Sequence, residues 1–283
     1  EIFTSGAVLT DNNFGNWKWA SKAGYKFHDL NANGRWDLNE SGLEGWTIFI
    51  DINDNGTFEP TVDKYGVTDS SGNYSISMIK PGIYDVYEFM GDQDPGWIQS
   101  FPGNDYHDEV FTSNKRNYNN FGNYKKATKS GFKFEDMNAN GAYDSGEPKL
   151  SGWAISVVGT DGAGNAVSMT VLTDSNGNYE FKLVPGIYTI SEENRTGWIQ
   201  SMPASGAYVD EVFTSGGNYP NNNFGNYRLA TKSGTKFYDR DIDGVWDVGD
   251  EEGLAGWTIY AVGTDGAGNA VNLSTITDSK GYY

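Results

Sequence analysis

The stretch 24-GYKFHDLNANGRWDLNESGLEGWTIFI-50 places a run of oxygen-bearing side chains between two β-rich segments. Its central part, DLNANGRWDLNE from Asp29 to Glu40, carries acidic or amide side chains at positions one, three, five, nine and twelve, with glycine at position six. Aromatic and β-branched residues in the flanks favour strands over helices. The stretch therefore predicts two strands joined by a loop in which oxygen donors gather.

The same stretch recurs along the chain. DMNANGAYDSGE begins at Asp136 and DRDIDGVWDVGD begins at Asp239. The run G-x-K-F-x-D opens at Gly24, Gly131 and Gly234, which gives a period of about 105 residues. The turn TDSSGNY returns as TDSNGNY and TDSKGYY, and PGIYDVYE returns as PGIYTISE. A period of this length fits one β-sandwich domain better than a solenoid repeat.

We therefore expect an all-β chain of tandem immunoglobulin-like β-sandwich domains, arranged as beads on a string, with about seven strands per unit. The predicted division is 1–20 for a closing strand of a preceding or neighbouring unit, 21–126 and 127–229 for two repeats, and 230–283 for an incomplete repeat. The links KKATKSG and RLATKSG contain neither a Gly/Ser tract nor proline. Such short links should limit the swing between neighbours.

The ends of the sequence are out of phase with the period. EIFTSGAVLTDNNFGNW at the start aligns with DEVFTSGGNYPNNNFGNY, the closing part of a unit, and Tyr283 falls just after the middle turn of the third unit. In one interpretation the sequence is a window from a longer array. In the other, the first strand of one chain completes the last domain of the next and builds a head-to-tail fibre. The third unit lacks about thirty residues that the leading segment does not supply, which favours the window.

Charge and composition restrict the partners. The net charge is -18, with 38 acidic residues against 20 basic ones. Nucleic-acid binding requires clustered Lys and Arg, so we expect no nucleic-acid partner. No apolar run is long enough to span a bilayer in this segment, and the absence of cysteine excludes disulfides. The acidic surplus suits a divalent cation.

The acidic loops match the spacing with which calcium loops present oxygen, here on strand-to-strand connections. A plain solvated turn is the alternative, because Asn, Asp and Gly favour turns without any ion. Three loops in register favour calcium as a structural cofactor, and DINDNGTFEPTVD from Asp51 is a fourth candidate. The predicted ligands, with a carbonyl at position seven, are Asp29, Asn31, Asn33, Arg35, Asp37 and Glu40; Asp136, Asn138, Asn140, Ala142, Asp144 and Glu147; Asp239, Asp241, Asp243, Val245, Asp247 and either Asp250 or Glu251; and Asp51, Asn53, Asn55, Thr57, Glu59 and Asp63.

The quoted stretch, the TDSSGNYSI turn, the PGIYDVYE run and the closing NFGNY are together similar to the SdrD B-like domains of bacterial and archaeal surface proteins, relatives of the collagen-adhesin B-type modules. The resemblance covers nearly the whole chain, in two full copies and two partial ones. It implies an immunoglobulin-like sandwich, calcium held by the acidic loop, and a role in a stalk or in surface display. It implies no enzyme activity.

The adhesin-type relatives sometimes carry an internal amide bond from Lys to Asn, formed beside an acidic side chain. The matching residues, in chain order, are Lys26, Glu88 and Asn120 or Asn123, and then Lys133, Glu192 and Asn223 or Asn226. The chemistry needs a neutral, desolvated Lys and a protonated acid. Simple alternation, however, places Tyr25 and Phe27 on one face of the strand and Lys26 on the other, which favours a surface lysine.

Weaker signals have structural explanations. N-x-S/T triplets at Asn73, Asn194 and Asn272 are candidate glycosylation sites, although such triplets arise by chance in Asn-rich chains. The tryptophans that recur on β-rich runs could stack on sugars, but a place in the sandwich core explains them better; they are Trp46, Trp97, Trp153, Trp198 and Trp257. His28 and His107 do not recur, and no nucleophile motif is present, so we expect no enzyme.

The sequence thus favours an extracellular structural or adhesive fibre or stalk, at a cell surface or in a secreted filament, built of calcium-stiffened domains. Its expected partners are copies of itself along a fibre or adjoining repeats of a longer chain, with surface glycans as possible ligands. The alternative is a non-catalytic spacer or carbohydrate-binding appendage of a large secreted enzyme.

Overall fold

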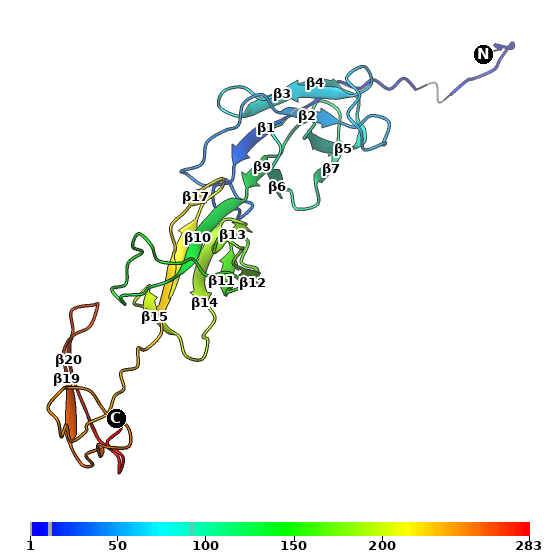
Figure 1. Ribbon diagram of the computed structural model, residues 1–283. Helices are drawn as coiled ribbons and strands as arrows, with labels where there is room; N and C mark the ends of the chain where they lie inside the picture. The colour runs from blue at the N-terminus through cyan, green and yellow to red at the C-terminus, as the bar shows by residue number, and fades with distance from the viewer. Residues whose placement is uncertain (1, 11–12, 92) are drawn as a thin grey trace.

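The computed structural model describes residues 2–10, 13–91 and 93–283, and within these ranges it contains twenty strands and no helix. Figure 1 shows the strands gathered in successive units along an elongated chain, with the two termini at opposite ends. The first two units are sandwiches of two sheets each. The predicted fold class, an all-β chain of tandem immunoglobulin-like sandwiches, is confirmed.

The first unit packs a five-stranded sheet against a four-stranded one. One sheet has the order β4-β1-β9-β6, with β8 also paired to β1, and the other has the order β3-β2-β5-β7. The strands are β1 (Ala20–His28), β2 (Thr47–Ile50), β3 (Lys64–Val67), β4 (Asn73–Ile79), β5 (Gly82–Phe89), β6 (Trp97–Phe101), β7 (Tyr106–Phe111), β8 (Arg116–Tyr118) and β9 (Phe121–Lys125).

The second unit repeats this topology. Its sheets have the orders β13-β10-β18-β15, with β17 paired to β10, and β12-β11-β14-β16. The strands are β10 (Ala127–Glu135), β11 (Ala154–Asp161), β12 (Ala166–Leu172), β13 (Asn178–Leu183), β14 (Gly186–Glu192), β15 (Ile199–Met202), β16 (Ala207–Phe213), β17 (Asn218–Tyr219) and β18 (Phe224–Tyr227).

Each of these two units therefore has nine strands, two more than the sequence predicted. The long first strand accounts for part of the difference, because it pairs in parallel with two short strands in succession. Residues 21–23 of β1 pair with β8, and residues 26–28 pair with β9. The first and the last strand of a unit thus lie side by side. Lys126 alone separates β9 from β10, so the link between the first two units is very short.

The core of each of the first two units lies between its two sheets. In the first unit Tyr74 and Phe121 from one sheet are buried with Ile48 and Val86 from the other. A corresponding cluster in the second unit includes Phe181. Along β13 the buried side chains alternate with exposed ones, as the period of a β-strand predicts, whereas β2 carries three buried residues in succession.

The tryptophan rings show where a sandwich is complete. Trp46 and Trp153 are each 2% exposed and make edge-to-face contacts with Trp97 and Trp198. Trp257, at the same place in the third unit, is 52% exposed, so its predicted place in a core is wrong. The third unit pairs only β19 (Thr258–Thr264) with β20 (Ala270–Ile276), and this two-stranded sheet has no second sheet to cover the ring.

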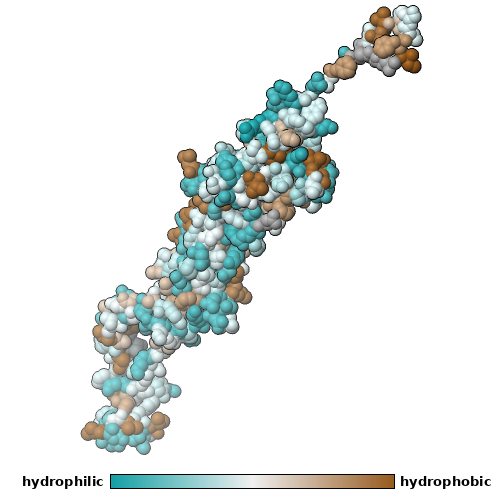
Figure 2. All heavy atoms as spheres, turned by 90° about the horizontal axis from the view of Figure 1, so that it is seen from above, coloured by the Kyte–Doolittle hydropathy of each residue, from teal (hydrophilic) through white to brown (hydrophobic). Residues whose placement is uncertain are grey.

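The leading segment precedes the first sheet. Residues 2–10 and 13–19 contain no strand, and their apolar side chains, such as Phe3 and Phe14, are exposed. Figure 2 shows brown, hydrophobic atoms gathered at this end, whereas the rest of the visible face is mostly hydrophilic with scattered brown patches. The assignment of this segment as a closing strand stays a prediction. Among the described residues there is no helix that could cross a membrane.

Candidate cross-linking and cation sites

Three polar side chains meet inside the first unit. Lys26 comes from β1, Glu88 from β5 and Asn123 from β9, so the group joins both sheets. Lys26 and Asn123 are fully buried, and Glu88 is 7% exposed. The Lys26 amine donates a hydrogen bond to Asn123 Oδ1 and lies 2.7 Å from Glu88 Oε2. Asn123 Nδ2 donates to Glu88 Oε1 over 2.7 Å, which closes the triad.

The expectation of a surface lysine at position 26 is wrong, because the face of β1 that carries Lys26 is fully covered, while Tyr25 on the other face is partly exposed. On one face the Lys26 amine lies beneath the ring of Trp46, 4.3 Å from its centroid. On the other face Phe27 is 1% exposed and stacks on Trp36, which belongs to the acidic loop. Alternation assigns residues to faces but does not say which face meets solvent.

The strand register selects the asparagine. Lys26 is opposite Phe121 and His28 is opposite Asn123, so Asn123 is a diagonal neighbour of Lys26 on the same face. Asn120 lies one step out of phase and accepts a hydrogen bond from the Tyr25 amide instead. The sequence left both asparagines open, and the structure brings only Asn123 to the lysine.

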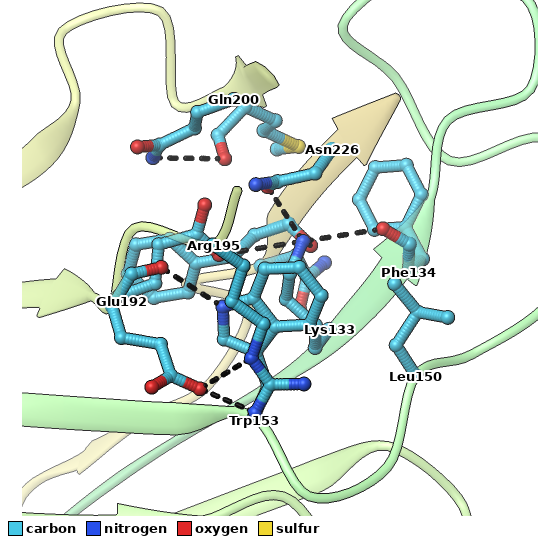
Figure 3. A network of polar contacts seen from close by, with 12 residues as sticks. Lys133, Phe134, Leu150, Trp153, Glu192, Arg195, Gln200 and Asn226 are labelled. Carbon is cyan, nitrogen blue, oxygen red and sulfur yellow. Dashed lines mark hydrogen bonds and ion pairs between the residues drawn. The ribbon is translucent and has the colours of Figure 1, made fainter. Parts of the chain in front are cut away.

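The second unit repeats the triad with Lys133 from β10, Glu192 from β14 and Asn226 from β18. Lys133 Nζ donates to Asn226 Oδ1 over 2.6 Å and lies 3.3 Å from Glu192 Oε2. Figure 3 shows the lysine and asparagine side chains pointing toward each other, with the amine also bonded to main-chain oxygens. Trp153 covers the amine at 4.5 Å, as Trp46 does in the first unit. Asn223, the other candidate, accepts a hydrogen bond from the Phe132 amide.

The electrostatics of the triads favour uncharged side chains. Burial lowers the pKa of Lys26 and of Lys133 to about 8, although the nearby carboxylates act in the opposite direction. Burial also raises the pKa of Glu88, and it raises that of Glu192 to about 7. The glutamate oxygen nearest the lysine, Oε2 in both units, is buried and has no hydrogen-bond partner despite its short distance to the amine. In each site, burial therefore shifts both the amine and the carboxyl group toward their uncharged forms.

A second buried lysine lies four residues before each triad lysine, and the sequence analysis did not single it out. Lys22 forms an ion pair with Glu109, and Lys129 forms one with Glu211 at 3.1 Å. Asn117 donates to Glu109, but its own Oδ1 is buried and has no hydrogen-bond partner, so it receives no bond from Lys22. The link from lysine to asparagine that defines the triads is missing here. In the sequence, the spacing of four residues between two lysines on one strand could have indicated this second buried lysine.

The first two acidic loops have the same internal hydrogen bonds. In the first, Asp29 accepts from the amides of Asn33 and Gly34, and Glu40 accepts from those of Leu30 and Asp37. The amide side chains at positions three and five both donate to the aspartate at position nine. The second loop repeats every one of these bonds in the same order at residues 136–147.

The third and fourth loops follow the same plan. In the third loop Glu251 accepts from the amides of Arg240 and Asp247, so Glu251 and not Asp250 takes the closing place. In the fourth, Asp63 accepts from the amides of Ile52 and Glu59 although it stands at position thirteen. In all four loops the residue at position seven donates its amide to the side chain at position five; these residues are Arg35, Thr57, Ala142 and Val245.

The donor sets of the loops fit a hard cation. The closing and opening carboxylates are buried in three loops, with Asp29 and Asp136 fully buried and Asp51 3% exposed. The side chains at positions three, five and nine point inward, and a half-turn of each amide would present oxygen in place of nitrogen. In the third loop the carboxylate oxygens of Asp239, Asp241 and Asp243 lie within 4.8 Å of one another. Calcium prefers such irregular oxygen cages.

The three candidate glycosylation sites differ in accessibility. Asn194 and Asn272 are exposed. The side chain of Asn73 donates to Asp69 within a turn and is partly buried. Glycosylation at all three stays a prediction.

The two sandwiches, their repeated motifs and their repeated sites define a protein built of tandem immunoglobulin-like units. Residues 130–234 match the family model of the SdrD B-like domain. The second unit is therefore an SdrD B-like domain, as its sequence motifs indicated.

Two curated relatives are similar over a longer part of the chain. Serine-aspartate repeat-containing protein F of Staphylococcus epidermidis is 26% identical over 297 residues, which cover 92% of this chain and 16% of that protein. Serine-aspartate repeat-containing protein D of Staphylococcus aureus (strain Newman) is 29% identical over 203 residues, which cover 69% of this chain and 14% of that protein. The chain thus spans a small part of the length of these relatives.

Solved structures show distant similarity. The Bacillus anthracis TIE protein is 17% identical, with 94% of this chain and 42% of that chain covered and a TM-score of 0.32. The shaft pilin SpaA of Lactobacillus rhamnosus GG is 12% identical, with 77% of this chain and all of that chain covered and a TM-score of 0.27.

Proposed function

We propose that this chain is part of an extracellular stalk or adhesive fibre whose units are stiffened by internal Lys–Asn amide bonds and by calcium. The observation that carries the proposal is the buried triad of lysine, glutamate and asparagine, present in both complete units with the same strand positions. Burial of an ionisable lysine costs stability unless the side chain has a partner. The triad recurs in both units where the first and last strands meet, which favours a role for the lysine in linking these two strands.

The triad can form the bond without an external reagent. The uncharged Lys26 amine attacks Cγ of Asn123, while the protonated Glu88 polarises the amide by hydrogen bonding. The glutamate carries the amine proton to the departing nitrogen, the original C–N bond of the side chain breaks, and ammonia leaves. The product is an amide bond between β1 and β9, with glutamate returned to its starting state. Lys133, Glu192 and Asn226 follow the same steps in the second unit.

Such a bond suits a protein that bears load along its length. β1 and β9 are parallel neighbours, and the chain enters the unit through one and leaves it through the other. A covalent link between them carries force past the rest of the sandwich. The acidic loops supply the second stiffening element, because an ion bound only by the folded state adds stability by mass action. Calcium sites of modest affinity work in extracellular proteins, where the ion is abundant.

Intact-mass spectrometry of the full chain tests the bond. The native protein should be lighter than its sequence mass by two molecules of ammonia, and Glu88→Ala should be lighter by one. Lys22→Ala is the matched control, because Lys22 is equally buried but lacks a bond to asparagine, and it should still lose two. A native mass equal to the sequence mass would remove the cross-link from the proposal.

A further inference from the structure

Consecutive units touch through the same pair of elements at both junctions. The turn between β11 and β12, with the sequence TDGAGN from Thr160 to Asn165, lies against the acidic loop of the first unit. A Cβ atom added at Gly162 would overlap the Asn31 carbonyl oxygen and lie 2.7 Å from its carbon. The same sequence recurs between β19 and β20, where a Cβ at Gly266 would overlap the Asn138 carbonyl of the second unit's loop.

The turn itself does not require glycine at these two positions. Gly164 and Gly268, two residues later, have φ angles of 87° and 85°, which only glycine adopts without strain, and a Cβ there would meet nothing within 4 Å. Gly162 and Gly266 have no positive φ. The nearest atoms to a Cβ at Gly162 all belong to the preceding unit, namely to Asn31 and Ala32. The neighbouring unit, and not the local backbone, therefore explains this glycine.

The residue at the fourth position of the acidic loop lies at the place where the hairpin of the next unit makes contact. Ala32 has a φ of 58° and is 5% exposed beneath the second unit, and Ala139 has the same φ and is partly buried near the third. In the third loop the same position holds Ile242, which is 88% exposed. A β-branched side chain at this fourth position would collide with the hairpin of the next unit. Alanine leaves room for the main chain of the hairpin to contact the main chain of the loop.

Hydrogen bonds fix the first junction around this contact. The Ser215 amide donates to the Leu30 carbonyl over 2.8 Å, and Ser215 Oγ lies 2.7 Å from His28 Nε2. The amide of Lys125, at the end of β9, also donates to Ser215 Oγ. The second unit thus holds the start of the acidic loop, where the loop leaves β1, together with the end of β9.

We propose that the outer, main-chain face of the acidic loop is a docking surface for the following repeat unit. The first glycine of TDGAGN and the alanine at loop position four form the recognition pair, and a repeat unit that carries the hairpin is the partner. The inward side chains of the same loop are those proposed to hold calcium. The dependence of docking on the ion, and only that part, rests on the proposed function.

The absence of cysteine permits a direct test in the full chain. Ser77→Cys in β4 and Lys182→Cys in β13 place spin labels at exposed positions of the first and second units. In calcium, the distances between the labels should form one narrow distribution. Gly162→Ala and Ala32→Ile should broaden or shift it, and Ala163→Val, an exposed neighbour in the same turn, should leave it unchanged. Thermal unfolding of each variant checks that the units remain folded.

An unchanged distribution in both Gly162→Ala and Ala32→Ile would overturn the docking surface. Chelator added to the labelled native protein tests the link to the ion, and a broader distribution is expected. If calorimetry shows calcium binding but chelator leaves the distances unchanged, the link is wrong and docking stands. If calorimetry shows no calcium binding, the cation part of the proposed function fails, while the two substitutions still decide the docking surface.

Discussion

At the scale of single residues, the triads predict an unusual pH dependence when the amide bond cannot form. Asn226→Ala removes the acceptor carbon and leaves Lys133 and Glu192 buried together. The pKa of Glu192 is about 7 in the folded state against 4.5 ordinarily, so stability falls as pH rises from 4.5 to 7. The pKa of Lys133 is about 8 against 10.5, so stability rises from pH 8 to 10.5.

The free energy of unfolding of Asn226→Ala should therefore pass through a minimum between pH 7 and 8, relative to the native protein. Urea unfolding across this pH range, followed by tryptophan fluorescence, measures the difference. The native protein is the control, because its lysine is consumed in the amide and no longer titrates. A loss of stability relative to the native protein that is flat across the pH range, or smallest between pH 7 and 8, would contradict the assignment of the buried pair.

The triad residues were predictable in chain order, but their burial was not. The motif order placed Lys26, Glu88 and an asparagine in the right elements. The alternation of β1 nevertheless favoured a surface lysine, because Tyr25 and Phe27 make the opposite face of the strand the apolar one. The choice of Asn123 depends on a parallel register between the first and last strands, which are far apart in the sequence. Local sequence carries little information about such pairings.

At the scale of elements, the geometry of the third acidic loop predicts which carboxylate would close the proposed calcium site. Glu251 accepts two main-chain amides, whereas Asp250 takes no such place in the loop. Loss of a charge-assisted ligand costs about 1.5–3 kcal/mol, so Glu251→Gln should weaken binding at this loop about tenfold or more. Asp250→Asn, which removes the same charge one residue away, should leave the affinity nearly unchanged. Calorimetric calcium titration of the two variants makes the comparison.

Equal losses in the two variants would show that charge alone, and not the loop geometry, holds the cation. The sequence could not separate these residues, because one inserted residue shifts both by a single place. The fourth loop illustrates the same limit, since Asp63 at position thirteen occupies the closing place through a longer turn. Spacing predicted the existence of each loop, and only the main-chain path decides which carboxylate takes its closing place.

At the scale of the whole molecule, the period of the sequence predicted the tandem sandwiches, and the contacts between units came from the structure alone. TDGAGN reads as an ordinary hairpin turn in isolation. Its first glycine acquires meaning only beside the carbonyl of Asn31 in another unit. The same holds for Trp257, whose motif matches Trp46 and Trp153 but whose ring lacks a second sheet. The sequence of one repeat cannot predict features that depend on contact with a neighbouring unit or sheet.

The response of the whole chain to force depends on whether the two proposed amide bonds form. With Lys26 bonded to Asn123 and Lys133 bonded to Asn226, force between the termini bypasses nearly all of each sandwich, so the enclosed residues cannot extend. Single-molecule pulling of the native protein should then show no long extension from the first two units. The double variant Asn123→Ala and Asn226→Ala should release roughly 300 Å of chain per unit, since an extended residue spans about 3.3–3.6 Å. The matched control is the double variant Asn120→Ala and Asn223→Ala. The side chains of these asparagines accept hydrogen bonds from main-chain amides of the first strands and do not contact the lysines, so their loss should leave the short extension intact. Long extensions in the native protein would mean that the triads are ion pairs and that the stiffness of the chain has another source.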